Sequence, residues 1–487
     1  MIRFHNKQWI LDAEKHIVDS TWRTICYYGR MLSYQTNLHV YPLTGNSNVL
    51  LLGDAWQVDP SRPSVEDEID TLAAKEFDLS LLYSKEETWC GRYVVLYKGT
   101  VVMDATGSMG CYIVESRVSS SFSLLWNIIS KEALPYVHLP EGTNIDFCPG
   151  PKTLSDDITR LMPSQVYDIE SGKYEFRPLL ISEFKNMADS ERLEKYIFYA
   201  QNSLKQMQSR TRLPIYCGIT GGRDSRVGVA LLESTGIEYI GYTLDLGEKS
   251  IADVAVAGKI AAITGNPYWL LHVNTEQRGI SMEEWRIHCG GLEAGTERNF
   301  MRLIEAVNEP KVIFLRCGIF ELICDYYSHE MEKPEWLYET FAYHGEFFKK
   351  ACEEWEELLA QDVINTNVNK WTRMYWDLRL GSWLSACEQS IDIYDTVDHY
   401  QIFNCRLFIE LLLGLDDKIR LNRDWENDVV RILYPKLVDV PYDTQFINGR
   451  LILKSIIAKI VKQLKRSIPK NMYNSLKKSF SALVHKI

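Results

Sequence analysis

The sequence lacks the long apolar run that a membrane-spanning helix needs, because nowhere do about 18 uncharged apolar residues follow one another. Its first residues also lack the apolar core of about 7–15 residues that marks a signal peptide. Eleven cysteines are present, but none forms a CxxC pair or a zinc-binding spacing with histidine. These absences favour a cytoplasmic protein with free thiols over a secreted disulfide scaffold or a zinc protein.

Acidic residues outnumber basic residues in the chain. The 487 residues include 54 Lys+Arg against 65 Asp+Glu, a net charge of −11, which argues against a nucleic-acid partner. The sequence also has no paired cysteine motif and no basic RNA-binding face in its central part, which disfavours an enzyme that thiolates tRNA. The hydrophobic fraction of 46% and the charged fraction of 24% are typical of a globular protein, here with two or three domains.

The C-terminal segment 451–487 departs from this acidic character. It carries nine Lys+Arg and no Asp or Glu, and its apolar residues follow a helical stripe. A basic amphipathic helix of this kind can lie on the anionic inner surface of a membrane or dock on a partner. The alternative is a C-terminal helix packed on the acidic body of the protein.

The pattern of apolar residues changes along the chain. Residues 1–150 contain short segments rich in β-branched and aromatic residues, for example 24–28, 48–52 and 92–97, which predict an α+β sandwich of antiparallel sheets. Residues 151–210 read as a linker and a leading helix. Within 211–450, short apolar strands alternate with helices, which predicts a doubly wound α/β domain with a largely helical C-terminal part.

The residues that point to chemistry lie directly after the first of these apolar strands, in the run Thr220-Gly221-Gly222-Arg223-Asp224-Ser225. Two glycines let the backbone bring N–H groups close to an anion, and the following helix presents its positive end. Thr220 and Ser225 can donate hydroxyl hydrogen bonds to phosphate, and Arg223 can offset its charge. The spacing fits neither a Walker A loop nor GxGxxG.

Asp224 beside a phosphate implies a bridging cation, and we therefore expect Mg²⁺ there. The alternative interpretation is an ordinary strand-to-helix turn in which Asp224 caps the helix. The strand before the loop and the alternating units after it favour the phosphate-binding interpretation.

The loop resembles the SGGxDS pyrophosphate loop of the ATP pyrophosphatase superfamily, with Thr220 in place of the first serine. Within that superfamily the chain resembles the asparagine synthetase and β-lactam synthetase group, through the segments 91–97, 153–163 and 253–261. The resemblance implies a degenerate glutamine amidotransferase-like domain over 1–150 and a HUP-like synthetase domain over 211–450. It also implies that Thr243, Leu244 and Gly318 lie near ATP.

Two departures from that group affect the expected function. A glutaminase of this type needs cysteine at position 2 as its nucleophile, and this chain has Ile2, so we expect no glutamine hydrolysis. The segment 315–322 takes the place of the group's SGEGSDEL motif, and Phe320 stands where that motif has a metal-binding acid. Glu321 or Asp325 could replace that acid, with Glu321 as the candidate metal ligand or catalytic residue. The alternative is that Glu321 is an ordinary solvated helix residue.

The resemblance also places Asp377 and Arg379 in the acyl-adenylate pocket, where a carboxylate could orient an incoming amine. A structural salt bridge is the alternative for this pair. The group's transition-state lysine has no clear counterpart, and Lys418, Arg420 and Arg423 are candidates by region only. His288 and His399 are expected to be packed residues rather than catalysts.

The resulting hypothesis is an ATP- and Mg²⁺-dependent, amide-forming ligase. It would adenylate a small-molecule, peptide or sugar carboxylate, release pyrophosphate, and transfer the acyl group to an amine with loss of AMP. The alternative is a protein that binds ATP but has lost turnover and acts as a scaffold or regulator.

Overall fold

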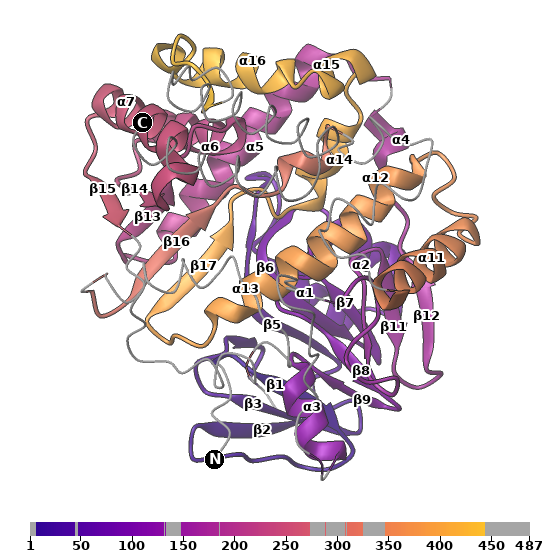
Figure 1. The fold of residues 1–487 in the computed structure, drawn as a ribbon. Helices are drawn as coiled ribbons and strands as arrows, with labels where there is room; N and C mark the ends of the chain where they lie inside the picture. The colour runs from indigo at the N-terminus through magenta and orange to yellow at the C-terminus, as the bar shows by residue number, and fades with distance from the viewer. Residues whose placement is uncertain are drawn as a thin grey trace, which may run out of the picture.

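The computed structural model describes residues 6–43, 47–130, 132, 148–184, 186–272, 288, 307, 309–324 and 346–443. Within these residues the chain forms two antiparallel sheets, then a parallel sheet, and then a helical region (Figure 1). This order agrees with the predicted fold class. Ile2, Asp325 and the basic segment 451–487 lie outside the described residues, so the expectations about them stay predictions.

Two six-stranded sheets make up the N-terminal sandwich. The first sheet has the order β10 (Thr159–Arg160), β8 (Tyr112–Val114), β9 (Arg117–Ser119), β1 (Trp9–Asp12), β3 (Arg30–Gln35) and β2 (Trp22–Tyr27). The second has the order β12 (Lys173–Phe176), β11 (Gln165–Asp168), β7 (Thr100–Met103), β6 (Trp89–Tyr97), β5 (Val49–Gln57) and β4 (Val40–Tyr41).

Alternation along β5 shows how the sandwich is layered. Leu50 and Leu52 pack between the two sheets, whereas Val49 and Leu51 face the opposite way, toward α1 (Val65–Ala74) and α2 (Leu79–Glu86), because successive strand residues point to opposite faces. A further helix, α3 (Phe122–Ile129), covers the outer face of the first sheet. The result is four layers in the order helix, sheet, sheet, helix.

The sandwich extends to Phe176 rather than ending at residue 150. Strands β10, β11 and β12 all lie within the segment that the sequence favours as a linker, and each pairs with a strand of a sheet. The connection to the next domain consists of α4 (Ile181–Phe184) and α5 (Asp189–Ser209).

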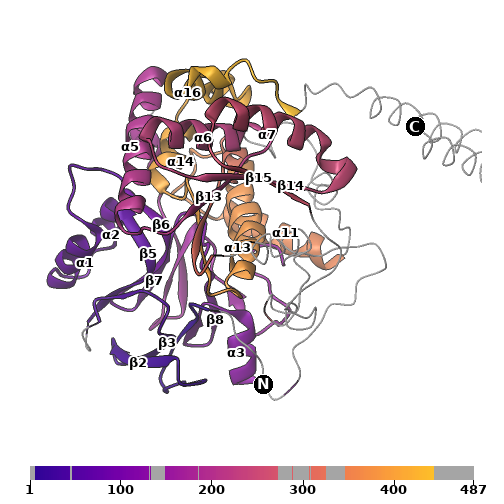
Figure 2. The ribbon, with the colours of Figure 1, turned by 90° about the vertical axis from the view of Figure 1, so that its left-hand side faces the viewer.

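The second domain is built on a five-stranded parallel sheet. Its order is β15 (Tyr268–His272), β14 (Ile240–Asp245), β13 (Ile215–Gly218), β16 (Val312–Arg316) and β17 (Val397–Gln401). One face packs against α5, α6 (Arg223–Thr235) and α7 (Ile251–Thr264), which lie together over the sheet in Figure 2. From β13 the chain adds β14 and β15 on one side of that strand, and then β16 and β17 on the other. The strand order therefore reverses between β13 and β16, which makes this position a topological switch point. In open α/β sheets, ligands bind outside the carboxyl ends of the strands at such a point.

The region after β16 is largely helical, as predicted. It contains the short 3₁₀ turn η2 (Phe320–Leu322), α11 (Glu346–Ala360), α12 (Lys370–Met374), the π-helix η3 (Tyr375–Leu384), α13 (Ser385–Ile391), α14 (Arg406–Leu413), α15 (Asp417–Leu421), α16 (Asp424–Leu433) and η4 (Pro435–Leu437). One more 3₁₀ turn, η1 (Gly247–Ser250), precedes α7. Among the described helices, none is both long and apolar enough to cross a bilayer.

Candidate functional site

A cavity of about 590 Å³ opens at the switch point, between the carboxyl ends of β13 and β16. Seven residues predicted from the sequence line it: Thr220, Gly222, Arg223, Asp224, Ser225, Gly318 and Glu321. Arg423, a candidate by region only, lines it as well. So do residues that the sequence did not indicate, among them Tyr242, Arg316, Trp383, Gln401 and Tyr442. The cavity therefore joins the predicted loop to segments more than 150 residues away.

The predicted loop connects β13 to α6 and is closed by its own hydroxyl groups. The Thr220 and Ser225 hydroxyl oxygens lie 2.8 Å apart, and the Gly222 N–H donates to Thr220 Oγ1 over 3.2 Å. Gly222 is the last residue before the helix. The first N–H groups of α6 have no partner within the helix and carry its positive dipole end, so this loop is a suitable anion site.

Asp253, at the start of α7, reaches this loop as well. Its Oδ1 accepts a hydrogen bond from the Gly221 N–H over 2.8 Å, and burial raises the pKa of this carboxyl group. A Cβ atom built on Gly221 would stand 2.6 Å from the Asp443 Cβ, so the close approach of the segment around Asp443 requires glycine here.

Asp224 is paired with an arginine from far along the chain. Arg423 donates through Nη2 to Asp224 Oδ1, and its Nε lies 3.0 Å from both carboxylate oxygens of Glu426. Burial raises the pKa of Asp224, and the nearby Glu321 adds to this, whereas Arg423 opposes it. Burial also raises the pKa of Glu426 to about 7, again against the effect of Arg423. Two acids and one guanidinium thus share a partly desolvated corner of the cavity.

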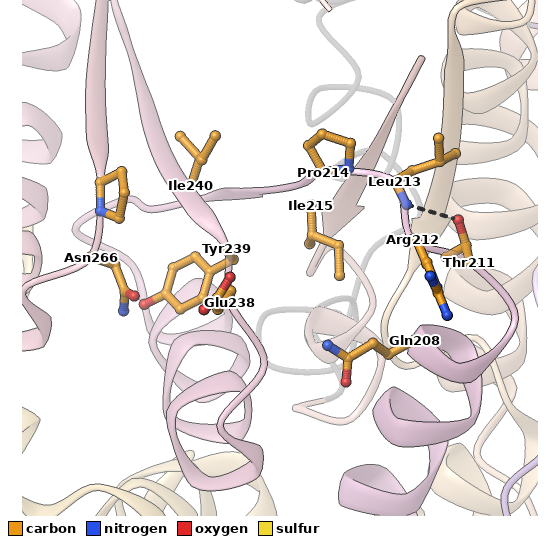
Figure 3. Close-up of a pocket in the computed structure, with 11 residues that line it drawn as sticks. Gln208, Thr211, Arg212, Leu213, Pro214, Ile215, Glu238, Tyr239, Ile240 and Asn266 are labelled. Carbon is orange, nitrogen blue, oxygen red and sulfur yellow. Dashed lines mark hydrogen bonds between the residues drawn. The ribbon is translucent and has the colours of Figure 1, made fainter. Parts of the chain in front are cut away.

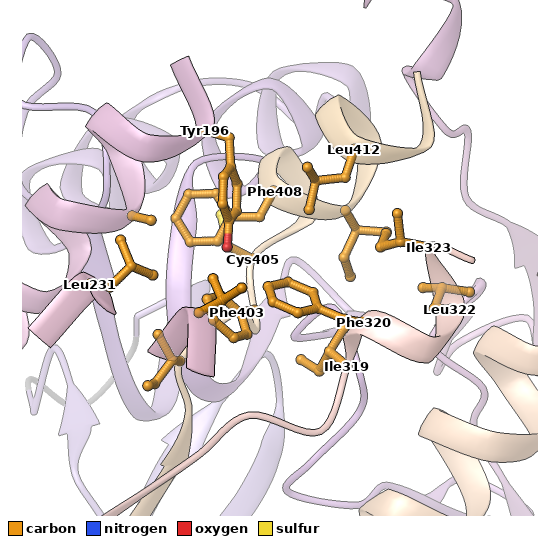
Figure 4. Close-up of a cluster of buried hydrophobic side chains, with 14 of the residues drawn as sticks. Tyr196, Leu231, Ile319, Phe320, Leu322, Ile323, Phe403, Cys405, Phe408 and Leu412 are labelled. Carbon is orange, nitrogen blue, oxygen red and sulfur yellow. The ribbon is translucent and has the colours of Figure 1, made fainter. Parts of the chain in front are cut away.

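Phe320, at the position where the related motif has an acid, belongs to the hydrophobic core. Its ring stacks on that of Phe403 at a centroid distance of 4.0 Å (Figure 4). It also meets the Trp425 ring edge-on at a centroid distance of 4.7 Å. The next residue, Glu321, points its carboxylate to the cavity side and accepts a hydrogen bond from the Tyr375 hydroxyl over 2.5 Å. The structure therefore places one carboxylate near Asp224 from this segment, and it is that of Glu321.

Asp377 and Arg379 are not among the residues that line the cavity. Asp377 is fully buried in η3, where it accepts hydrogen bonds from the Ser164 N–H at 3.2 Å and hydroxyl at 2.7 Å. Burial raises its pKa to about 6. The Arg379 guanidinium lies 3.5 Å over the Trp383 ring, and Trp383 does line the cavity, so Arg379 stands one side chain behind the wall.

Thr243 and Leu244 lie in the interior of β14 and are likewise not among the lining residues. The Thr243 hydroxyl donates to the Ile219 carbonyl oxygen over 2.5 Å, which ties β14 to the residue before the loop. Tyr242, one residue earlier on the same strand, is the one that reaches the cavity.

A buried polar network fixes the β16 side of the cavity. The Gly318 N–H donates to Gln401 Oε1 over 2.8 Å, and Gln401 Nε2 donates to Glu388 over 2.7 Å. Arg316 Nη1 also donates to Glu388 over 2.8 Å. Burial alone would raise the pKa of Glu388, but Arg316 and His399 lower it to about 2.

The network continues into the N-terminal sandwich through His399 and Asp392. His399 lies 2.6 Å from Glu388 through Nδ1 and 3.0 Å from Asp392 through Nε2. Arg92 on β6 donates to both Asp392 oxygens over 2.6 Å. Burial raises the pKa of Asp392, but the Arg92 guanidinium prevails and holds it well below its usual range. His399 is packed, as expected, but within a charge network that connects the two domains.

His288 is packed as well. Its Nε2 lies 2.9 Å from the Gln389 carbonyl oxygen and 3.0 Å from that of Ser390. Three residues are candidates for the role of the group's transition-state lysine: Lys418, Arg420 and Arg423. Arg420 donates a hydrogen bond to the Ile323 carbonyl oxygen and pairs with Asp417. Of the three, only Arg423 lines the cavity.

A second cavity, of about 770 Å³, lies at the opposite edge of the parallel sheet (Figure 3). It is lined by residues around the amino ends of β13 and β14, among them Pro214, Tyr239 and Asn266. Because ligands of open α/β sheets bind at the carboxyl ends of the strands, the smaller cavity at the loop is the better candidate site.

Comparison with known proteins gives no family model that matches the sequence and no curated protein that matches it. Among solved structures, the chain is similar to the U34-tRNA thiolase NcsA from Methanococcus maripaludis, with 11% identity, a TM-score of 0.26, and coverage of 64% of this chain and 86% of that one. It is also similar to the NH3-dependent NAD synthetase from Campylobacter jejuni, with 13% identity, a TM-score of 0.23, and coverage of 40% and 95%. The NMN synthetase from Francisella tularensis matches with 12% identity, a TM-score of 0.21, and coverage of 40% and 94%. Overlaps this weak leave the function to be argued from the residues of this chain, and membership of the asparagine synthetase group stays a prediction.

Proposed function

We propose that this protein binds ATP in the switch-point cavity and uses it to adenylate a carboxylate, from which an amine then displaces AMP. The acyl donor would be a small-molecule, peptide or sugar carboxylate. The observation that carries the proposal is the glycine-containing loop between β13 and α6, which lines a cavity at the position where open α/β sheets bind ligands.

The phosphates would lie against the loop. The backbone N–H groups at the start of α6 and the hydroxyl groups of Thr220 and Ser225 are hydrogen-bond donors for phosphate oxygens. Arg223 and Arg316 line the same cavity, and guanidinium groups bind phosphate through paired N–H donors. Such fixed donors lower the barrier to attack at the α-phosphate by positioning the triphosphate and offsetting the charge that develops on it.

Glu321 is the candidate for contact with the amine. Its carboxylate lines the cavity and is held by the Tyr375 hydroxyl, so it could orient an ammonium group or accept a proton from it. Asp377 is placed differently, because both of its oxygens accept hydrogen bonds from Ser164 in a fully buried position. We therefore assign Asp377 a positioning role in η3, and Arg379 a role in holding the Trp383 wall.

The Mg²⁺ expected at Asp224 and Glu321 fits these side chains poorly as they are arranged. Asp224 Oδ1 is bonded to Arg423, and Glu321 Oε2 is bonded to Tyr375. Across the described ranges, no three His, Cys, Asp or Glu side chains converge as a metal site. We derive no step of the reaction through a metal ion.

Glutamine is not proposed as the amine source. Two cysteines of the sandwich, Cys90 and Cys111, give little support to thiol chemistry, because both are fully buried. Burial raises the pKa of Cys90 to about 12 and that of Cys111 further, so both thiols stay protonated and weakly nucleophilic at neutral pH.

A second candidate function is ATP binding without turnover. Two observations favour it: Phe320 is committed to the aromatic core, and Asp224 is engaged by Arg423. Such a protein would bind ATP in the same cavity and release neither pyrophosphate nor AMP.

A cavity-filling variant tests both candidates. A Cβ on Gly318 would meet its nearest neighbours, the Gln401 amide atoms, at 3.6 Å or more, so Gly318→Val can be built in without clashing at Cβ while adding volume to the cavity wall. Gly258→Ala on α7 is the control, because a Cβ there meets nothing within 4 Å.

ATP binding would be measured by calorimetry, and pyrophosphate and AMP release would be assayed against a panel of carboxylates and amines. We expect Gly318→Val to weaken ATP binding by about tenfold or more, with Gly258→Ala unchanged. Release of AMP and pyrophosphate in equal amounts supports the ligase, and binding without release supports the second candidate. Equal ATP affinity in wild type and Gly318→Val would refute the cavity as the nucleotide site.

A further inference from the structure

Arg423 stands among three carboxylates at the mouth of the candidate site. Its guanidinium contacts Asp224 and both oxygens of Glu426, and Glu321 is close enough to raise the pKa of Asp224. Glu426 is almost fully buried, with 1% of its side chain exposed, whereas Asp224 and Arg423 are 21% and 23% exposed. The guanidinium is thus anchored from the protein interior and presented toward the cavity.

The backbone at Arg423 is also unusual. The residue precedes α16 with φ 60° and ψ 28°, in the left-handed region, which costs a residue with a side chain about 1 kcal/mol or more. Its carbonyl oxygen accepts a hydrogen bond from Arg223 Nη1 over 3.2 Å. Main chain and side chain of Arg423 are therefore both fixed onto the first turn of α6. A residue held in a strained conformation by several contacts at a cavity is a candidate for a functional role.

We propose that Arg423 is a resident cation of this site, and that its guanidinium supplies at Asp224 the positive charge that a divalent ion would otherwise supply. An arginine fork is suited to this position, because it can bind a carboxylate and a phosphate at the same time through different N–H groups. Nη2 and Nε are engaged by Asp224 and Glu426, whereas Nη1 donates to none of the described residues. Its role toward a nucleotide rests on the proposed function, but its role toward metal ions does not.

The first experiment asks whether the site accepts a divalent ion without any nucleotide. Mn²⁺ would be titrated by electron paramagnetic resonance into the wild-type protein and three variants: Asp224→Asn, Arg423→Met, and the two substitutions combined. The titrations are run at about pH 8, because loss of Arg423 raises the pKa of the remaining carboxyl groups. The control is Arg431→Met on α16, the helix that follows Arg423. It also removes an arginine with an acidic partner three residues away, here an exposed pair.

We expect wild type and Arg431→Met to show no Mn²⁺ site that depends on Asp224. Arg423→Met should bind one Mn²⁺ at least about tenfold more tightly than wild type, because the charge on the ligands sets the affinity, and the double variant should lose that site. An Mn²⁺ site in the wild type that Asp224→Asn removes would overturn the proposal. So would the absence of a gained site in a folded Arg423→Met. The wild-type titration decides the point even if that variant does not fold.

The second experiment measures ATP affinity with excess EDTA and with excess Mg²⁺. We expect the two values to agree within about threefold for wild type, and Arg423→Met to bind about tenfold more weakly in EDTA and to recover in Mg²⁺. Wild-type binding that requires Mg²⁺ would contradict the role of Arg423. If ATP binds under neither condition, the proposed function fails, while the Mn²⁺ result still decides whether Arg423 is the cation at Asp224.

Discussion

Glu410 on α14 gives the structure a pH dependence that can be measured directly. The side chain is 2% exposed, and its Oε2 accepts a hydrogen bond from the Leu180 N–H over 2.6 Å. Burial raises its pKa from 4.5 to about 8, with Glu87 adding to the shift and Arg406 opposing it. We therefore expect Glu410 to be protonated in the folded protein at neutral pH.

The size and sign of the effect follow from linkage between protonation and folding. A pKa of about 8 in the folded state against 4.5 in the unfolded state corresponds to about 5 kcal/mol at most. Because the folded-state pKa is the higher one, the stabilisation is complete below pH 4.5 and is lost as the pH rises through 8. Between these values the contribution of Glu410 to the free energy of unfolding falls by about 1.4 kcal/mol per pH unit.

The perturbation is Glu410→Gln, which resembles the protonated acid in shape and can still accept the Leu180 hydrogen bond. The free energy of unfolding would be measured by urea denaturation from about pH 5 to about pH 8.5. We expect the variant to lose less stability than wild type over this range, and to be the more stable protein at its upper end. The control is Glu353→Gln, whose side chain is 47% exposed.

The reasoning is refuted if Glu410→Gln and wild type lose stability in parallel with pH. It is also refuted if the variant becomes less stable than wild type at high pH. That second result would mean that Glu410 is ionised in the folded protein and held by Arg406, the group that opposes the shift.

Three further variants test the site. Gly221→Ala should destabilise the protein by about 1–3 kcal/mol and weaken ATP binding, because its methyl group would displace Asp443. The control, Gly222→Ala, should be tolerated structurally, and equal unfolding midpoints for the two variants would contradict the packing argument. Phe320→Asp should lower the free energy of unfolding by at least about 4 kcal/mol without adding Mn²⁺ affinity, because it buries an acid in an aromatic cluster. A folded variant that binds Mn²⁺ would show that this position can serve as a metal ligand. Asp377→Asn should raise the free energy of unfolding above about pH 6, because the buried acid of the wild type ionises there at a cost in stability. ATP affinity should stay unchanged, and weaker ATP binding in a stable variant would give Asp377 a direct role in binding.

The parallel sheet could be predicted because its strands carry their signal locally. Segments 239–244 and 268–273 are short and apolar, and helical spacing separates them, which predicts strands of a parallel sheet. β14 and β15 lie there, with β15 only partly buried at the edge of the sheet. Strands β10 to β12 could not be found in the same way. β12 alternates polar and aromatic residues over only four positions, Lys173 to Phe176, and its first three residues are exposed, so its strand signal is short. Its neighbours lie among prolines and glycines that suggest a linker.

The site, like the fold, could be predicted only where its signal is local in the sequence. The loop over 220–225 is a contiguous pattern with a local physical meaning, and the structure brings it to the cavity. Arg423, Gln401 and Tyr442 join it only through the packing of distant helices and strands, and a single sequence does not show which distant residues meet. The substitution at Phe320 is visible in the sequence as a missing acid, whereas the pairing of Asp224 with Arg423 depends on the tertiary fold.

The buried network gives a physical reason why the sandwich belongs to this protein. Gly318, whose backbone lines the cavity, is held by Gln401, and Gln401 by Glu388. Glu388 is in turn linked through His399 and Asp392 to Arg92 on β6 of the sandwich. Removing one partner of a buried ion pair leaves an uncompensated charge, typically at a cost of about 3–5 kcal/mol, so the two domains stabilise one another through this chain. In this arrangement the sandwich contributes, through Arg92, the support behind one wall of the candidate cavity.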